Sequence, residues 1–367
     1  MRAIIISVDF GSPDHQAHAD EFTMLAQGAG AEILATVIAK RDRPDAKFFI
    51  GSGKVDEAKL VAETHSAEIV LFDQALSPAQ QRNLERAFNL RVIDRVTLIL
   101  DIFAVRAKSH EGKLQVELAQ LQHLTTRLTR LWTHLERQQG GIGMRGPGES
   151  QLEMDKRMIG DKVRTLRERL RKVERQRTTQ RRARSRSNTL SVSLVGYTNA
   201  GKSTLFNALT RAGAYAADQL FATLDTTTRR IWLENAGQVT ISDTVGFIRD
   251  LPTTLIAAFK ATLEETVHAD VLLHVIDASS AQRDEQIFEV NKVLQEINAQ
   301  DIPTILVYNK IDLAGYEPKV DIDDSGKVVR VYVSAQERTG LDGLRAAIAQ
   351  AKIDILGNNE VETFEDF

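Results

Sequence analysis

The sequence predicts an α/β protein with three parts: a small N-terminal parallel α/β domain, a long antiparallel helical hairpin and a C-terminal α/β domain. Strand and helix signals alternate over residues 1–108, and two apolar stripes at helical spacing follow in residues 109–188. Residues 189–357 contain apolar strands that end in polar or glycine-rich loops, and residues 358–367 form an acidic tail. Alternating strands and helices indicate parallel sheets, and paired apolar stripes indicate two packed helices.

In the N-terminal part, four short apolar runs predict strands, at residues 3–8, 32–38, 68–72 and 91–93. Between the last two runs, Ser77-Pro78-Ala79-Gln80 predicts the start of a helix. A serine suits the N-cap, a proline suits the first turn, and a glutamine three residues after the cap can complete a capping box. The alternation predicts a small parallel sheet with helices between its strands.

A glycine-rich run in the same part, Gly51-Ser52-Gly53-Lys54, is similar to the end of a phosphate-binding loop. The spacing differs at both ends, because Phe48 stands where the first glycine belongs and Val55 where a Mg²⁺-binding hydroxyl belongs. We favour a tight turn that leads into a helix over residues 55–65. The alternative is that this run binds ATP in a protein that binds or remodels RNA.

The middle part contains two apolar stripes. The first is Leu114, Leu118, Leu121, Leu128 and Leu135, and the second is Ile159, Val163, Leu166, Leu170 and Val173. Between the stripes, residues 139–150 contain five glycines and a proline, far more chain than the ~2–5 residues needed to join two antiparallel helices. The pattern predicts a helical hairpin with a glycine-rich tip. This tip, which holds Arg145, is either a flexible hairpin end or a thin probe that enters RNA.

Charge is distributed unevenly along the 367 residues, although the net charge is only −3. Residues 151–190 carry 14 Lys and Arg against 5 Asp and Glu, a net charge of +9, which leaves −12 for the rest. Such an excess is typical of a segment that binds a polyanion, and the ordinary alternative is a solvated helix face. We favour contact between residues 164–186 and RNA phosphates.

The composition excludes several classes of protein. The chain has no cysteine, which excludes disulfides and thiolate metal sites. No apolar run approaches the ~20 residues of a membrane span, and the N-terminus lacks the basic start and cleavage site of a signal peptide. We expect a cytoplasmic protein and a monomer, and weak association with a membrane surface stays open.

The most specific motif lies near the start of the C-terminal part. It matches G-x4-G-K-[ST] and consists of Gly196, Tyr197, Thr198, Asn199, Ala200, Gly201, Lys202 and Ser203. An apolar strand at residues 190–195 precedes it and a helix at residues 204–211 follows, which is the context of a phosphate-binding loop, or P-loop. The glycines let backbone N–H groups surround phosphate oxygens. Lys202 is predicted to reach the β- and γ-phosphates, and the Ser203 hydroxyl to bind Mg²⁺.

Two later loops predict that the bound base is guanine. The first comprises Asn309, Lys310, Ile311 and Asp312, and the second comprises Ser334, Ala335 and Gln336. Each loop follows an apolar strand. The Asp312 carboxylate can accept hydrogen bonds from the N1–H and 2-amino groups of guanine, whereas adenine offers no such pair of donors. In this order after a P-loop, the two loops predict a P-loop GTPase domain.

Two loops between the P-loop and the base loops are predicted to sense the terminal phosphate. One consists of Asp243, Thr244, Val245 and Gly246, and the other of Phe221, Ala222, Thr223, Leu224 and Asp225. Asp243 is expected near Mg²⁺, through water, and the Gly246 N–H near the γ-phosphate. Thr223 is our choice for the second Mg²⁺-binding hydroxyl, while Thr226, Thr227 and Thr228 remain alternatives.

Together these motifs resemble those of the translation-factor-related GTPases. The particular residues within them resemble the HflX family of ribosome-associated GTPases. The runs Phe48–Lys54 and Gly140–Glu149 are similar to segments of that family too, so the resemblance covers nearly the whole chain. It supports Thr223 as a Mg²⁺ ligand, and Lys202, Thr223 and Gly246 are then the predicted catalytic residues. It also implies that the hairpin tip enters the large ribosomal subunit, close to the peptidyl-transferase centre and its rRNA. The implied function is separation of stalled or idle ribosomes into subunits.

The expected hydrolysis mechanism is incomplete. Many GTPases place a glutamine soon after the second phosphate-sensing loop to orient the attacking water, but Phe247 directly follows Gly246 here. A phenyl ring cannot hold water by hydrogen bonding, so we expect a low intrinsic rate and stimulation by the ribosome. Asn199 is expected either to bind K⁺, as in some relatives, or to form a hydrogen bond within its loop. An RNA-modifying GTPase is a further alternative, although the sequence shows neither a cofactor site nor a catalytic cysteine.

Overall fold

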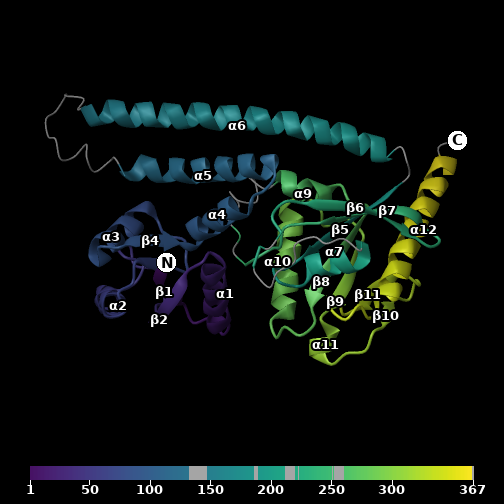
Figure 1. The fold of residues 1–367 in the computed structure, drawn as a ribbon, viewed down its shortest axis with the longest axis horizontal. Coiled ribbons are helices and arrows are strands. Elements are labelled where there is room, and N and C mark those ends of the chain that lie inside the picture. Colours follow the sequence, from purple (N-terminus) through teal and green to yellow (C-terminus); the bar gives the residue numbers. More distant parts are fainter. Residues whose placement is uncertain are drawn as a thin grey trace. The chain divides into compact units, whose positions relative to one another are not determined.

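The computed structural model describes residues 1–131, 147–185, 189–210, 220–221, 223–249, 251 and 260–365. These residues form two compact units, Met1–Val105 with Lys113–Leu170, and Arg106–Gly112 with Arg171–Phe367. The elements are an N-terminal parallel sheet, two long helices and a larger C-terminal sheet (Figure 1), which confirms the predicted fold class. The domain boundaries predicted from the sequence stay predictions. Among the described residues, no helix combines the length and apolar character needed to cross a bilayer.

The sheet of the first unit is parallel, with the strand order β2-β1-β3-β4. Its strands are β1 (Arg2–Asp9), β2 (Glu32–Lys40), β3 (Ile69–Phe72) and β4 (Arg91–Asp94), close to the four predicted runs. The helices between and after them are α1 (His15–Gly28), α2 (Ser52–Thr64), α3 (Pro78–Phe88) and α4 (Arg95–Arg106). Apolar side chains of the strands pack against α2 and α3 in a cluster that includes Ile4, Val70 and Leu84.

Local sequence signals set the helix starts in this unit. Ser77 caps α3 as predicted: Gln80 N–H donates to the Ser77 hydroxyl at 3.3 Å, and Ser77 N–H donates to Gln80 Oε1 at 3.0 Å. The predicted tight turn lies just before the glycine-rich run, at residues 46–48, where the N–H and C=O groups of Asp45 and Phe49 pair with each other. The helix that follows begins at Ser52, three residues earlier than predicted, because Gly51 supplies the N-cap.

Two long helices follow, α5 (His110–Leu131) and α6 (Pro147–Ser185) (Figure 1). They pack through both predicted stripes, because Leu114, Leu118 and Leu166 form a buried cluster that Val163 and Leu170 also contact. The hairpin tip between them, including Arg145, lies outside the described residues. The predicted tip of residues 139–150 is too long at its end, because Pro147 already begins α6, where proline suits the first helical position.

The sheet of the second unit has the order β10-β11-β9-β8-β5-β7-β6. Its strands are β5 (Leu190–Gly196), β6 (Thr227–Leu233), β7 (Gly237–Asp243), β8 (Val271–Asp277), β9 (Thr304–Asn309), β10 (Val320–Ile322) and β11 (Val328–Tyr332). The five central strands from β11 to β7 are parallel, and β6 and β10 pair antiparallel at the edges. The chain leaves β5 toward β7 and later returns to β8 on the other side of β5. This switch point is where open α/β sheets place their ligands.

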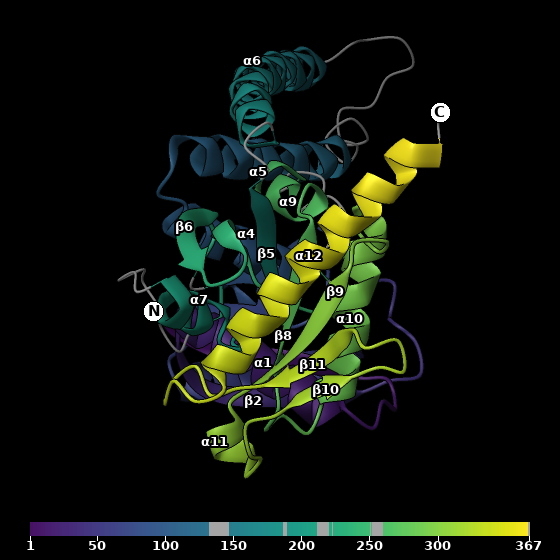
Figure 2. The same ribbon diagram turned by 90° about the vertical axis from the view of Figure 1, so that its right-hand side faces the viewer.

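Helices cover both faces of this sheet. They are α7 (Lys202–Thr210), α9 (Lys260–Val267), α10 (Arg283–Glu296), α11 (Ile311–Ala314) and α12 (Leu341–Glu365). Side chains of α7 and α12, among them Phe206 and Leu344, share one buried cluster with the strands. Figure 2 shows α12 and α10 on opposite faces of the sheet. The helix α12 includes residues 358–365 of the predicted acidic tail.

Candidate functional site

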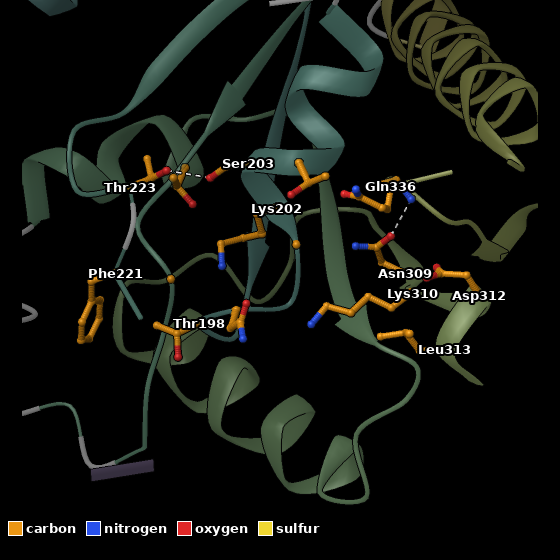
Figure 3. A pocket seen from close by; sticks show the side chains of 16 residues that line it. Thr198, Lys202, Ser203, Phe221, Thr223, Asn309, Lys310, Asp312, Leu313 and Gln336 are labelled. Atoms are coloured by element: carbon orange, nitrogen blue, oxygen red, sulfur yellow. Dashed lines mark hydrogen bonds between the residues drawn. The ribbon is translucent and has the colours of Figure 1, made fainter. Parts of the chain in front are cut away.

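A cavity of about 480 Å³ opens at the carboxyl ends of β5, β7 and β9 (Figure 3). It is lined by Thr198, Asn199, Gly201, Lys202, Ser203, Thr204, Phe221, Thr223, Thr244, Gly246, Asn309, Lys310, Asp312, Leu313, Ala335 and Gln336. Residues from all five predicted motifs therefore meet in one place. Because the first motif ends at Ser203 and the last begins only at Ser334, the parallel sheet is what brings them together.

The P-loop follows β5, and two of its glycines are required by the backbone. Gly196 has a φ of 149°, and a Cβ there would lie 2.2 Å from the carbonyl oxygen of Val275 on β8. Gly201 has a φ of 91°, and a Cβ there would lie 2.2 Å from Asn309 Nδ2. The loop therefore curls in a conformation that side chains would block, which lets a phosphate approach its backbone closely.

Lys202 begins α7 and is buried, with 6% of its surface exposed. Its Nζ donates hydrogen bonds to the carbonyl oxygens of Gly196 at 3.1 Å and Tyr197 at 2.7 Å. Burial lowers the pKa of the Lys202 ammonium to about 8, against the opposing effect of the Asp243 carboxylate. Nearby His274 on β8 has its pKa lowered to about 4, first by burial and then by Lys202, so it is neutral at neutral pH. The ammonium is thus held in a dry place where an anion would be strongly attracted.

Three oxygen-bearing side chains meet beside Lys202. Ser203 Oγ lies 2.7 Å from Thr223 Oγ1 and donates to Asp243 Oδ2 at 2.7 Å, while Thr223 Oγ1 donates to the same oxygen at 3.1 Å. The other oxygen, Asp243 Oδ1, is buried and has no hydrogen-bond partner among the described residues. Burial raises the pKa of the Asp243 carboxyl, which Ser203 and Lys202 partly offset. Two hydroxyls and an under-compensated carboxylate form a set of hard oxygens that suits Mg²⁺.

The predicted alternatives to Thr223 lie elsewhere. Thr227 and Thr228 belong to the edge strand β6, where Thr228 Oγ1 contacts Ser242 Oγ at 2.9 Å. Thr226 precedes that strand, and neither it nor the other two lines the cavity. Only Thr223 of the four candidate threonines is therefore placed beside Ser203. Ala222 in the same predicted loop lies outside the described residues.

Asn309 at the end of β9 connects two loops of the cavity. Its Nδ2 donates to the carbonyl oxygen of Ala200 at 2.9 Å, and its Oδ1 accepts from the N–H of Ala335 at 3.0 Å (Figure 3). The side chain is buried, with 2% exposed. The residue predicted to contact the nucleotide thus fastens the P-loop to the loop that begins at Ser334.

The side of the cavity away from the P-loop is formed by the start of α11. Lys310 has a left-handed backbone with a φ of 62°, and its Nζ forms an ion pair with Asp277 Oδ2 at 2.8 Å. Asp312 lines the cavity from the first turn of α11, beside Leu313 (Figure 3). The Asp312 carboxylate is exposed, and no described residue donates a hydrogen bond to it. A base with two adjacent N–H donors would satisfy this carboxylate.

The chain just after the predicted phosphate-sensing loop Asp243–Gly246 pairs with the P-loop as a neighbouring strand would. Thr198 N–H donates to the Phe247 carbonyl at 2.7 Å, and Phe247 N–H donates to the Gly196 carbonyl at 3.1 Å. Arg249 N–H donates to the Tyr197 hydroxyl at 2.9 Å. Gly246 lies so close to Thr198 that a Cβ would meet the Thr198 Cγ2 at 2.8 Å. The backbone of Gly246 therefore faces the cavity directly, while the Phe247 side chain is fully buried.

Several predicted residues support the site without lining the cavity. They are Gly196, Tyr197, Ala200, Leu224, Asp225, Asp243, Val245, Ile311 and Ser334. Leu224, Val245 and Ile311 are buried among other side chains, and Asp225 instead binds the segment Arg106–Gly112. The sequence analysis missed Thr204 and Leu313, which line the cavity, and Asp277, which forms the ion pair with Lys310. Asp277 ends β8 at the edge where the predicted loops gather, and that position was the available signal.

Comparison with known proteins agrees with this geometry. Residues 16–104 match the family described as GTP-binding GTPase N-terminal, residues 106–184 the GTP-binding GTPase Middle Region, and residues 191–310 the 50S ribosome-binding GTPase. The chain is 53% identical to GTPase HflX of Escherichia coli (strain K12) over 350 residues, which cover 95% of this chain and 82% of that protein. This chain belongs to the HflX family of GTPases. A second HflX, from Caldanaerobacter subterraneus, is 45% identical over 99% of this chain and 82% of that protein.

The fold has a solved counterpart. The crystal structure of SsGBP in complex with GDP has a TM-score of 0.53 to this structure and 24% sequence identity, covering 97% of this chain and 99% of that chain. At this level of identity the likeness concerns the fold alone. With the family established, this HflX chain is an enzyme that binds and hydrolyses GTP. The prediction of a GTPase of the HflX family is confirmed.

Proposed function

We propose that this HflX GTPase binds the large ribosomal subunit through its rRNA and separates stalled or idle ribosomes into subunits. The observation that carries the proposal is the charge on α6. Arg167, Arg169, Arg171, Lys172 and Arg175 are all exposed on this helix. Acidic neighbours are few, and Glu168 and Glu174 are the only ones between Arg164 and Arg175. A row of exposed guanidinium groups suits RNA phosphates, and the matched family model is described as ribosome-binding.

Within the cavity, we assign the triphosphate to the P-loop. Backbone N–H groups at the start of α7 and the Lys202 ammonium would hold the β- and γ-phosphates, and the Gly246 N–H would contact the γ-phosphate. Asp312 would accept from guanine, in a base site bounded by Lys310 and Gln336. The depressed pKa of Lys202 and the exposed Asp312 carboxylate support this assignment, because phosphate would stabilise the ammonium and guanine N–H groups could reach the carboxylate.

Ser203 and Thr223 are the residues that would hold Mg²⁺, with Asp243 acting through water. Their hydroxyls are 2.7 Å apart and both bind the Asp243 carboxylate, whose second oxygen is buried without a partner in the described chain. When bound, Mg²⁺ supplies charge neutralisation of the phosphates. The two hydroxyls would hold it, and the position of Thr223 would then depend on whether the γ-phosphate is present.

Hydrolysis by the free protein is expected to be slow. Phe247 occupies the place of a water-positioning glutamine, and its side chain is fully buried away from the cavity. Its backbone is tied to Gly196 and Thr198, so the ring stays out of reach of an attacking water. The missing group must therefore come from a partner or from a rearranged loop, for which the ribosome is the proposed source.

Asn199 is the proposed ligand for a potassium ion. It lines the cavity with a left-handed φ of 61°, a conformation that asparagine tolerates well. No described residue is shown to hold its side chain by a hydrogen bond. A monovalent cation there would add positive charge beside the transferring phosphate. Replacing K⁺ by Na⁺ at equal ionic strength is expected to slow hydrolysis.

Cosedimentation with purified large subunits tests the central proposal. We expect more binding with a GTP analogue than with GDP or ATP, and binding that weakens steeply as salt is raised. Single-turnover hydrolysis should be faster by about a hundredfold or more when subunits are present. Equal binding in all nucleotide states, or a free enzyme as fast as the stimulated one, would contradict the proposal. Loss of whole ribosomes in a density gradient then measures subunit separation.

A further inference from the structure

The carboxylate of Asp225 holds the chain that leads into α5. It accepts hydrogen bonds from Lys108 N–H at 2.8 Å, from Ser109 N–H at 2.7 Å and from the Ser109 hydroxyl at 2.5 Å. The Ser109 hydroxyl in turn accepts from Gly112 N–H at 2.8 Å, in the manner of a helix N-cap. The segment Arg106–Gly112 belongs to the same compact unit as the GTPase sheet. We call this segment the connector.

A glycine in the connector permits this contact. A Cβ on Gly112 would lie 2.3 Å from Asp225 Oδ1, closer than real Cβ contacts come, and 3.0 Å from Ser109 Oγ. The connector makes a second contact at the other end of the predicted phosphate-sensing loop Phe221–Asp225. There, Arg106 Nη1 donates to the Phe221 carbonyl at 3.3 Å. The loop is therefore fastened to the connector on both sides of Thr223.

Thr223 stands between these two attachments and faces the proposed Mg²⁺ site. Its Oγ1 lies 2.7 Å from Ser203 Oγ and 3.1 Å from Asp243 Oδ2. Only Leu224 separates it from Asp225, and two residues of extended chain span at most about 7 Å. Leu224 is itself buried, with 2% exposed, which leaves the chain little slack. A carboxylate held by three donors therefore limits where the Thr223 hydroxyl can be.

We propose that Asp225 is a residue that positions Thr223. By its hydrogen bonds to the connector, Asp225 keeps Thr223 where the Thr223 hydroxyl can bind Mg²⁺ when the γ-phosphate of GTP is present. The inference rests on the proposed role of Thr223. Coupling of this kind is reciprocal, so GTP that draws Thr223 inward also fixes the connector and the first turn of α5. The contact between Asp225 and Ser109 then couples the nucleotide state to the start of α5.

The test compares affinities for a non-hydrolysable GTP analogue and for GDP, both with Mg²⁺. Asp225→Asn removes the negative charge that accepts hydrogen bonds from three donors. It should lower the ratio of the affinity for the GTP analogue to the affinity for GDP by about tenfold. Gly112→Ala pushes the carboxylate away and should lower the ratio in the same direction. Alanine also favours a helix over glycine, so this loss is not a loss of α5. Gly160→Ala in α6 is the matched control, since nothing lies within 4 Å of its Cβ position, and it should leave the ratio unchanged.

Thr223→Ala, measured in parallel, separates the two proposals. If Thr223→Ala keeps the full preference for GTP, the proposed Mg²⁺ role of Thr223 is wrong. If Thr223→Ala loses it while Asp225→Asn and Gly112→Ala keep it, the positioning role of Asp225 is wrong. Hydrogen exchange gives a second readout, because the amides of Lys108, Ser109 and Gly112 should exchange more slowly with the GTP analogue than with GDP. Equal exchange in both states would also overturn the inference.

Discussion

Asn309 Nδ2 lies 2.9 Å from the carbonyl oxygen of Ala200, and the Cβ that Gly201 lacks would lie 2.2 Å from the same nitrogen. The end of β9 and the P-loop are therefore packed so closely that only a hydrogen atom fits between them. Asn309 cannot easily move aside, because its other end accepts from Ala335 N–H at 3.0 Å. The P-loop and the loop proposed to hold the base are therefore one connected structure.

Gly201→Ala should therefore weaken binding of both GDP and GTP by about tenfold or more, through the displaced Asn309 bonds and a φ of 91° that alanine rarely adopts. Equilibrium titration with fluorescent nucleotides measures the effect. Gly53→Ala is a suitable control, because nothing lies within 4 Å of its Cβ position and its φ is not positive. Normal affinity in the Gly201 variant would show that the contact does not shape the site.

Asp312→Asn should exchange the preferred base. An asparagine amide presents an N–H donor where guanine also has donors, so GTP should bind more weakly by about tenfold or more. Xanthine carries an oxygen in place of the 2-amino group, and the new donor can bind it. Competition between GTP and XTP measures the change. A variant that still prefers GTP would place the base elsewhere in the cavity.

Lys202 should make nucleotide affinity depend on pH. Its pKa is lowered to about 8 in the nucleotide-free protein, and neighbouring phosphates would raise it again. Binding above about pH 8 therefore takes up a proton, and affinity should fall by up to about tenfold per pH unit there. Calorimetry in buffers of different ionisation heat measures the uptake, which should vanish near pH 6.5. Constant affinity from about pH 7 to 9 would contradict a depressed lysine.

Lys202 should make folding stability depend on pH in the direction opposite to nucleotide affinity. Because its folded pKa of about 8 lies below the ordinary 10.5, the unfolded chain binds more protons between these values. The contribution of Lys202 to stability without nucleotide therefore rises with pH across that window, while nucleotide affinity falls. Denaturant unfolding of the wild type and of Lys202→Met separates the contribution, since the variant should lack this rise.

The arginines of α6 should govern ribosome binding without changing the nucleotide site. Arg167→Glu with Arg171→Glu should weaken cosedimentation with large subunits and reduce its salt dependence. Both side chains are exposed, so the fold should tolerate the change. Lys327→Glu, on an exposed loop of the GTPase unit, gives a control for charge reversal alone. The rate of GTP hydrolysis without ribosomal subunits should be the same in the wild type, the double arginine variant and Lys327→Glu.

The sequence determined much of this protein by itself. Short-range patterns were sufficient wherever a physical requirement is local: the capping box at Ser77, the four N-terminal strands, the two apolar stripes and the four motif loops that follow strands. Motif spacing was also enough to predict a guanine-nucleotide cavity, because parallel strands deliver their carboxyl ends to one edge of a sheet.

Only the tertiary structure decided which side chains meet. Four threonines competed for one role in the sequence, and packing of β6 against β7 turned two of them away while Thr223 stayed 2.7 Å from Ser203. Asp225 was predicted at the nucleotide and instead grips the connector, over a hundred residues earlier in the chain. Asp277 was missed because its partner, Lys310, lies just after the neighbouring strand β9. Such pairings depend on sheet order and register, which are set by contacts between distant segments and leave no trace in local spacing.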